Sequence, residues 1–226
     1  MRRVAVYAGT RNIYEKMATS ARSLLAHTHM DRVIFLMEDD QFPEYLPDVI
    51  ECINVSGQRW FNPKGPNYQS RWTYMALMRL VMPAIIVDEA RTLWLDCDTI
   101  VLKDLEPLFD LDMNGMTFAM VEEPKRSISE GIIYHNSGVV LMDLNRMLGV
   151  MGKLVAKINS TKMQYPDQDV INHTCQGKIL TIPPVWNSCP YTGQPEDPAI
   201  VHFAAQQNYA KHPLFMEYAD MDWQCV

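Results

Sequence analysis

Residues 93–104, LWLDCDTIVLKD, run from an apolar strand directly into two carboxylates, Asp96 and Asp98. In an extended chain, side chains two residues apart point the same way, so both carboxylates are expected to face one point while Cys97 faces the other side. Two converging carboxylates are costly unless a cation lies between them. Hard oxygen ligands suit Mn²⁺ or Mg²⁺, which commonly hold a diphosphate. The stretch therefore predicts a metal site, and the alternative is a strand that ends in a solvated acidic turn.

Short apolar segments alternate with amphipathic segments along the rest of the chain, which is typical of an α/β sheet. The segment 32–38 is almost continuously apolar and is expected to be buried on both faces. Rossmann-like sheets bind ligands beyond the carboxyl ends of their strands, where Asp96 and Asp98 lie. Two loops, 122–132 and 183–198, are expected to carry specificity. We expect strands at residues 4–7, 32–38, 49–55, 93–96, 117–121, 138–142, 178–182 and 200–203, helices at residues 13–27, 70–81, 144–158 and 168–176, and a single domain over residues 1–226.

The charge and composition of the chain limit the kinds of partner that we expect it to bind. The 226 residues carry a formal net charge of -7, and the basic side chains are scattered, so nucleic acid is an unexpected partner. The segment 218–226 is acidic and has no base, so it offers no basic tail for an anionic membrane. No apolar run reaches membrane-spanning length. The five cysteines form no C-x-x-C pair and read as reduced thiols, and the first apolar run is too short for a signal peptide; both favour a cytoplasmic location.

Four further segments accompany the Asp-x-Asp stretch: 74–83 (YMALMRLVMP), 135–142 (HNSGVVLM), 165–172 (YPDQDVIN) and 200–203 (IVHF). In this order, and together with residues 93–104, they resemble glycosyltransferase family 8. That retaining group includes glycogenin and the bacterial lipopolysaccharide galactosyl- and glucosyltransferases. The resemblance implies the glycosyltransferase A (GT-A) fold, a Rossmann-like open mixed sheet flanked by helices. It also implies metal-dependent, retaining transfer of a hexose from a UDP-sugar to a glycan, lipid-linked or protein acceptor.

The resemblance assigns roles to individual residues, each of which has a simpler alternative. His202 would complete the metal shell of Asp96 and Asp98, whereas a lone His in an apolar strand is more often a core residue. Arg79 would reach the nucleotide phosphate or Asp96, whereas the alternative is an Arg whose stem packs on the surface and whose charge stays in water. Further donor-binding residues are expected at Ala8, Thr10, Asn12, Cys97, Asn136, Ser137, Ala205 and Lys211.

The segment that begins the helix at 168 is expected to hold the sugar. In the family, the residues that match Asp167 and Gln168 lie near the anomeric carbon, and we treat both as catalytic. A neutral Gln can stabilise developing positive charge without trapping it covalently. The alternative is a helix N-terminus with acids in its first turn. Asn136 would contact the sugar, although it also fits a turn, and Gly138 would let the backbone approach a ligand closely.

Two departures from the family pattern bear on function. The family usually has an Asp where Gly9 or Thr10 stands, so the base preference is open, with Thr10, Asn12 and Tyr14 as the available groups. The late motif His-x-x-Gly-x-x-Lys is replaced by His202, Ala205 and Asn208, so the diphosphate-binding Lys is missing in register and Lys211 is its candidate substitute. Because of these departures, one alternative function stays open: a degenerate module that binds a sugar nucleotide without turnover. A nucleotidyltransferase is a further alternative, although residues 9–11 are a poor phosphate loop.

Overall fold

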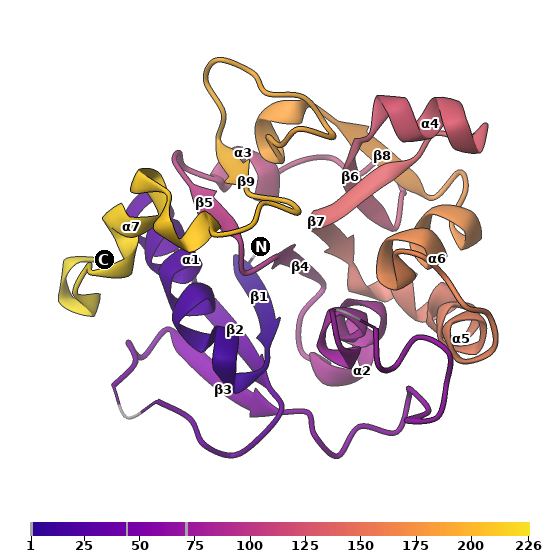
Figure 1. The fold of residues 1–226 in the computed structure, drawn as a ribbon, viewed down its shortest axis with the longest axis horizontal. Coiled ribbons are helices and arrows are strands. Elements are labelled where there is room, and N and C mark those ends of the chain that lie inside the picture. Colours follow the sequence, from indigo (N-terminus) through magenta and orange to yellow (C-terminus); the bar gives the residue numbers. More distant parts are fainter. Residues whose placement is uncertain (1, 44, 71) are drawn as a thin grey trace.

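The computed structural model describes residues 2–43, 45–70 and 72–226, and its centre is a seven-stranded mixed sheet in the order β3-β2-β1-β4-β7-β6-β8 (Figure 1). The strands β1, β2, β3 and β4 are parallel, β7 is antiparallel to both of its neighbours, and β8 is parallel to β6. The expected open mixed sheet is therefore confirmed. The strands are β1 (Val4–Gly9), β2 (Arg32–Met37), β3 (Ile50–Asn54), β4 (Arg91–Leu95), β6 (Phe118–Glu122), β7 (His135–Asp143) and β8 (Ile179–Ile182).

Helices cover both faces of this sheet because its strands are apolar on both sides. On one face, Tyr7 and Phe35 pack with Met17 and Leu24 of α1 (Tyr14–His27). On the other face, Val6 packs with residues of α5 (Leu144–Ser160) and of the 3₁₀ helix Tyr74–Val81. The expected burial of β2 on both faces is confirmed, since its last five residues are buried.

The helix predicted at 70–81 begins later than expected, and residue 71 of that prediction lies outside the described residues. Thr73 has φ 59°, and its side chain accepts a hydrogen bond from Met75 N. The chain then forms a 3₁₀ helix, Tyr74–Val81, and α2 (Met82–Ile85) begins only where Pro83 can occupy the first turn. Proline fits that position because a first-turn N–H has no helical partner.

The segment 122–132 was expected to be a loop and instead contains α4 (Pro124–Glu130). The helix begins at a proline and ends at Gly131, which has φ 67°. A proline at the start and a left-handed glycine after the end are recognised helix boundaries. The prediction of a loop was wrong because it did not use these two signals.

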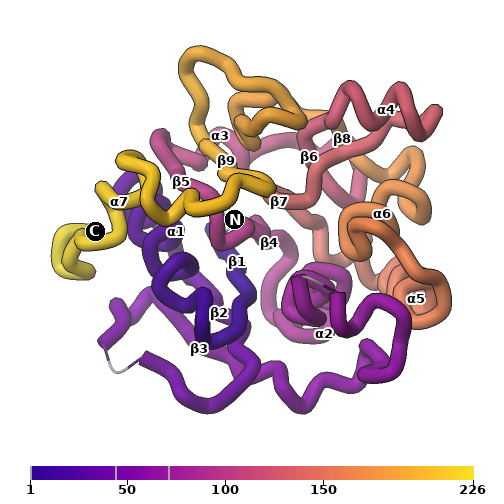
Figure 2. The backbone as a smooth tube through the Cα atoms, viewed as in Figure 1, coloured from indigo at the N-terminus to yellow at the C-terminus, as the bar shows by residue number. Residues whose placement is uncertain are grey.

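A small second sheet, which the sequence did not predict in full, brings the late part of the chain to the end of β4. It pairs β5 (Thr99–Val101) with β9 (Ile200–His202), and Thr99 lies opposite His202. Figure 2 shows how the yellow C-terminal part of the chain returns past the indigo N-terminal part. The remaining helices are α3 (Glu106–Phe109), α6 (Pro166–Thr174) and α7 (Pro213–Ala219).

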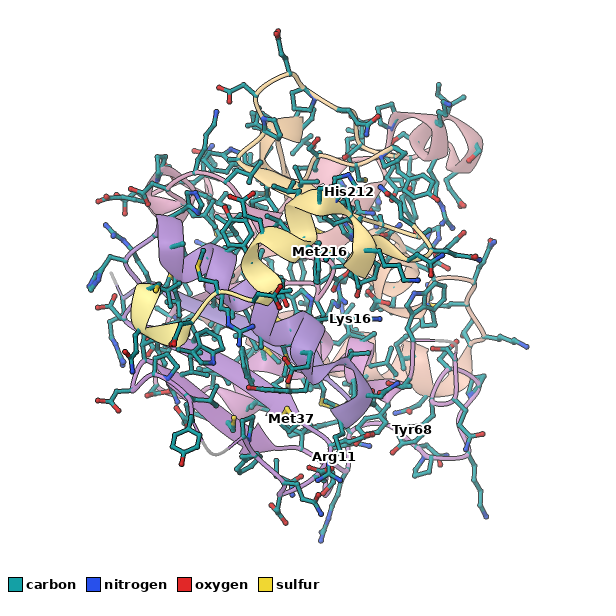
Figure 3. The ribbon with its side chains drawn as sticks, turned by 60° about the vertical axis from the view of Figure 1, so that its left-hand side comes forward. Arg11, Lys16, Met37, Tyr68, His212 and Met216 are labelled. Atoms are coloured by element: carbon teal, nitrogen blue, oxygen red, sulfur yellow. The ribbon has the colours of Figure 1, made fainter. Side chains whose placement is uncertain are left out.

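The helix α7 holds the C-terminal part of the chain against α1. In Figure 3, Lys16 marks α1 and Met216 marks α7, and the two helices contact each other. All five cysteines have free thiols. Among the described residues, no helix combines the length and the apolar character needed to cross a bilayer.

Candidate active site

A cleft of about 800 Å³ opens beyond the carboxyl ends of β1 and β4. It lies where parallel strands of an open sheet end, which is the usual ligand position for this architecture. Lys211 is exposed and is not among the described residues that line it. The cleft gathers the other expected site residues, Ala8, Thr10, Asn12, Arg79, Asp96, Cys97, Asp98, Asn136, Ser137, Asp167, Gln168, His202 and Ala205.

The Asp-x-Asp stretch is a turn and not an extended strand. β4 ends at Leu95, and both the backbone N–H and the hydroxyl of Thr99 donate to the carbonyl of Asp96, at 3.2 and 2.8 Å. The thiol of Cys97 donates to the carbonyl of Ala8 at 3.4 Å. The two carboxylates therefore converge because the backbone turns, and the prediction from strand alternation reached the right arrangement for the wrong reason.

Asp96, Asp98 and His202 form a cluster whose ligand atoms lie within 4.8 Å of one another. His202 Nε2 is 3.2 Å from Asp98 Oδ1 and 4.0 Å from Asp96 Oδ2. The other oxygen of Asp96 is already used, since it accepts hydrogen bonds from Arg79 at 2.7 Å and Trp94 Nε1 at 2.9 Å. Two carboxylates and one imidazole suit Mn²⁺, and the side chains of Asp96 and Asp98 are 29% and 23% exposed to the cleft. The residues therefore fit a divalent cation.

The pKa shifts within the cluster also indicate that it favours a bound positive charge. Burial opposes a charge on His202, but the nearby Asp98 carboxylate outweighs it and raises the pKa of His202 to about 10. Burial likewise opposes the charge on Asp98, and the pairing with His202 still holds the pKa of Asp98 below its usual value. Burial raises the pKa of Asp96 against the opposing effect of Arg79. The carboxylates thus favour positive charge at the point where they meet the imidazole.

Gly138 makes room for His202. A Cβ at position 138 would overlap the imidazole, lying 2.6 Å from Nδ1 and 2.8 Å from Nε2. Real Cβ atoms are not found so close to a ring, so a side chain at 138 would displace His202. The carbonyl of Gly138 also accepts a hydrogen bond from Asp96 N at 2.8 Å. We expected this glycine to admit a ligand, and the space that it provides is filled by the His202 ring.

Arg79 is a buried link between the cluster and α6. It is 3% exposed, which rules out the surface alternative. Its guanidinium contacts Asp96 at 2.7 Å and Asp167 at 3.3 Å, bonds the carbonyl of Ser137, and stacks on Trp94 at 4.5 Å. The expected contact with Asp96 is therefore present. Buried Arg with two carboxylate partners holds both of them in a fixed geometry.

A network of hydrogen bonds builds the wall opposite β1. Ser137 Oγ donates to Asp167 at 2.8 Å, and Ser137 N donates to Gln168 Oε1 at 3.0 Å. Asn136 Nδ2 and Gln168 Nε2 both donate to Glu123 Oε1, at 2.7 and 3.1 Å. Asp167 does not cap α6, because the N-cap position is Tyr165 and its N–H bonds Asp169. Side chains on β7, α6 and the loop after β6 are thus held as one unit.

Sequence reasoning missed two members of this wall. Glu123 follows directly after β6, and Asn187 lies in the loop 183–198; they are 7% and 0% exposed. Asn187 accepts a hydrogen bond from His202 Nδ1 and donates to Asn136, both at 2.8 Å. Glu123 lies in the segment 122–132, just before α4, and Asn187 in the loop 183–198, the two segments that were expected to carry specificity. A carboxylate at the carboxyl end of a strand was a usable signal for Glu123, whereas Asn187 had none.

The wall formed by β1 and the residues after β9 is less connected. Thr10 and Asn12 bond each other, while Tyr14 packs against Phe35 with ring centroids 6.3 Å apart and lies outside the described lining. Ala205 has φ 57°, a left-handed conformation that glycine adopts more readily. Lys16 lies 5.1 Å above the ring of Tyr209, which lines the cleft. Lys16 is therefore a cation near the cleft that the sequence did not indicate.

Comparisons with known families agree with this geometry. Residues 5–208 match the model described as Glycosyl transferase family 8. General stress protein A of Bacillus subtilis (strain 168) is 28% identical, over 66% of this chain and 65% of its own length. Lipopolysaccharide 1,2-glucosyltransferase of Escherichia coli (strain K12) is 31% identical, over 63% of this chain and 44% of its own. The chain thus spans less than two thirds of the length of these relatives.

Solved structures show the same fold. The galactosyltransferase LgtC, crystallised with donor and acceptor sugar analogs, aligns with a TM-score of 0.72 at 20% identity and covers 96% of this chain and 95% of its own. The glycosyltransferase GlyE of Streptococcus pneumoniae TIGR4 aligns with a TM-score of 0.72 at 20% identity, over 99% of this chain and 62% of its own. The mixed sheet flanked by helices is the GT-A fold of these proteins.

Proposed function

This chain belongs to glycosyltransferase family 8, and we propose that it transfers a hexose, glucose or galactose, from a UDP-sugar with retention of anomeric configuration. One observation carries the proposal. A single cleft places the Asp96–Asp98–His202 cluster beside a buried wall that contains Asp167 and Gln168. A cluster suited to a cation that holds a diphosphate therefore adjoins groups suited to holding a sugar.

The cluster would bind the diphosphate end of the donor through a divalent cation, Mn²⁺ or Mg²⁺, held by Asp96, Asp98 and His202. The cation supplies Lewis-acid stabilisation of the leaving diphosphate. Arg79 keeps one oxygen of Asp96 occupied, so the other oxygen stays directed at the cluster. Lys16, beside Tyr209, and the more exposed Lys211 are the candidates for an additional cation at the diphosphate.

The buried wall would hold the hexose and guard the face opposite the leaving group. Glu123 Oε1 already accepts two amide hydrogen bonds, and Asp167 Oδ2 is bound by Ser137 and Arg79. Oxygens engaged in this way are suited to positioning and are poor nucleophiles. A front-face reaction fits this arrangement, in which a phosphate oxygen of the leaving group takes the acceptor's proton. Gln168 would stabilise the positive charge that develops on the sugar.

The decisive experiment is a screen of UDP-sugars with Mn²⁺, read first by thermal shift and then by hydrolysis of the donor to UDP. An active transferase is expected to release UDP slowly to water, whereas a degenerate binding module would be stabilised without releasing it. Once an acceptor has been found, product NMR is expected to show an α-linkage from an α-configured donor. A β-linked product would contradict both retention and the proposed role of Gln168.

A further inference from the structure

Asn187 joins the proposed metal site to the proposed sugar site. Its side chain is fully buried and lies between His202 and Asn136, at 2.8 Å from each. Its backbone carbonyl also accepts a hydrogen bond from Thr192, which anchors this part of the loop 183–198. A buried amide with partners on both sides is costly to disturb, because either partner would lose a hydrogen bond without access to water.

The orientation of this amide follows from groups whose roles are fixed. An amide can be turned either way, so its orientation has to be inferred from its partners. Gly138 N can only donate, and it bonds one terminal atom of Asn136 at 2.9 Å, so that atom is Oδ1. The other terminal atom faces the Glu123 carboxylate at 2.7 Å and is therefore Nδ2.

The orientation of Asn136 in turn determines which ring nitrogen of His202 carries a proton. Because Asn136 presents its oxygen, Asn187 must present its NH₂ group to Asn136 and its oxygen to His202. An oxygen acceptor requires a proton on His202 Nδ1. When a cation takes the place of the Nε2 proton, the neutral ring offers its lone pair on Nε2, the nitrogen that faces Asp98 at 3.2 Å. A backbone N–H in β7 therefore determines, through two amides, which imidazole nitrogen is offered to a cation.

We propose that Asn187 is a positioning residue that holds His202 in the Nδ1–H form and so aims Nε2 at the cation. Its bond to Asn136 couples this site to the buried wall of β7 and α6. The inference rests on the proposed function for the nature of the cation. The hydrogen-bonded state of His202 does not depend on turnover, so it can be measured independently of any transferase activity.

The test compares two substitutions that separate the bonds of Asn187. Asn187→Ala removes both and is expected to weaken Mn²⁺ binding roughly 10- to 100-fold, the range for losing a group that orients a metal ligand. Asn187→Asp keeps an acceptor for His202 Nδ1–H and loses the donor to Asn136, so Mn²⁺ affinity should stay within about threefold of the native value. Affinity would be measured by calorimetry with Mn²⁺ alone and with Mn²⁺ plus UDP.

A matched control separates positioning from loss of stability. Asn67 is another buried Asn, 1% exposed, and it bonds the backbone of Ile158, Thr161 and Met163 away from the cluster. Asn67→Ala should lower the melting temperature and leave Mn²⁺ affinity unchanged. In ¹⁵N NMR of the Mg²⁺-loaded native protein, the His202 signals, assigned with His202→Gln, should show a protonated, hydrogen-bonded Nδ1.

Several outcomes would overturn the inference. One is native Mn²⁺ affinity in an Asn187→Ala variant that folds. Another is an equal loss of Mn²⁺ affinity in Asn187→Asp and Asn187→Ala. A bare Nδ1 on His202 in the native protein would overturn it without any variant, so the test survives a variant that fails to fold. If Mn²⁺ binds and responds to Asn187 while no UDP-sugar is turned over, the inference stands and the proposed transferase activity fails.

Discussion

The two walls of the cleft are built differently. On the wall of β7 and α6, the residues Asn136, Ser137, Asp167 and Gln168 are each at most 8% exposed, and their side chains have named hydrogen-bond partners. On the wall that follows β1, Asn12 is exposed and bonds its neighbour Thr10. A buried network fixes the position of each member, whereas an exposed pair can adjust to what it binds. On the proposed function, the wall of β7 and α6 is the sugar wall, preorganised for chemistry, and the wall that follows β1 is the nucleotide wall, which adapts to what it binds.

The difference between the walls predicts how many neighbouring groups a substitution disturbs. A typical buried hydrogen bond contributes about 1 kcal/mol net, but a partner left unpaired costs about 1–3 kcal/mol more. Changes on the sugar wall or at the cluster should therefore alter several groups together. Changes on the nucleotide wall should stay local.

The largest effect is expected at the cluster itself, from Asp98→Asn. Removing a charge from the cation's ligand set should lower turnover by at least about 1000-fold, since the cation contributes several kcal/mol to charge stabilisation. The fold should persist, because the substitution conserves side-chain volume and the backbone carbonyl of Asp98 keeps its bond to Phe203 N at 2.8 Å. UDP release and circular dichroism would measure both. Activity that survives both this variant and EDTA would remove the metal from the proposal.

Gln168→Ala should give the next largest effect and would show whether the sugar wall acts on the transition state. Loss of one preorganised polar group typically lowers turnover by roughly 10- to 1000-fold, and we expect little change in donor affinity. The control is Gln176→Ala, an exposed Gln just beyond α6 and outside the described lining. If donor affinity falls as much as turnover, Gln168 binds the ground state and the catalytic assignment is wrong.

The two walls also differ in how well the sequence predicts them. The strands β1 and β2 and the last three residues of β4 were predictable because burial on both faces makes them almost continuously apolar. The three cluster residues were predictable because their segments carry recognisable neighbours in a fixed order. The turn at Asp96 was not, since nothing local distinguishes the end of β4 from one more extended residue.

Glu123 and Asn187 escaped prediction for a different reason. Their partners lie on other elements: Glu123 bonds Gln168 of α6, and Asn187 bonds His202 of β9. Such contacts depend on how the loops are placed by the whole fold, and side-chain type alone does not report it. The short strand β5 was missed likewise, because its pairing with β9 comes from a segment about 100 residues later.

A smaller effect is expected from Gly138→Ala, which tests whether the walls meet at His202. The added Cβ must displace the imidazole, so Mn²⁺ affinity should fall roughly 10- to 100-fold and stability by about 1–3 kcal/mol. Gly149→Ala on α5 is the control, because its Cβ would meet nothing within 4 Å. That change should stabilise the helix by up to about 1 kcal/mol and leave metal binding alone. Normal Mn²⁺ affinity in Gly138→Ala would mean that His202 is not a ligand.

The smallest effect is expected on the adaptable wall, from Ala205→Gly. Ala205 is exposed and has φ 57°, a conformation that costs an L-residue with a Cβ about 1–2 kcal/mol. Glycine removes this cost but loses more conformational freedom on folding, by about 0.5–1 kcal/mol, so a net stabilisation of about 0.5–1 kcal/mol is expected. Ala204→Gly is the control, since Ala204 is not among the described residues with positive φ and should only lose stability. Denaturant unfolding of both variants measures the difference. Because this wall lacks the buried network, Mn²⁺ affinity should stay native in Ala205→Gly. A loss of affinity comparable to that in Gly138→Ala would show that the two walls are coupled, and the contrast between them would then be wrong.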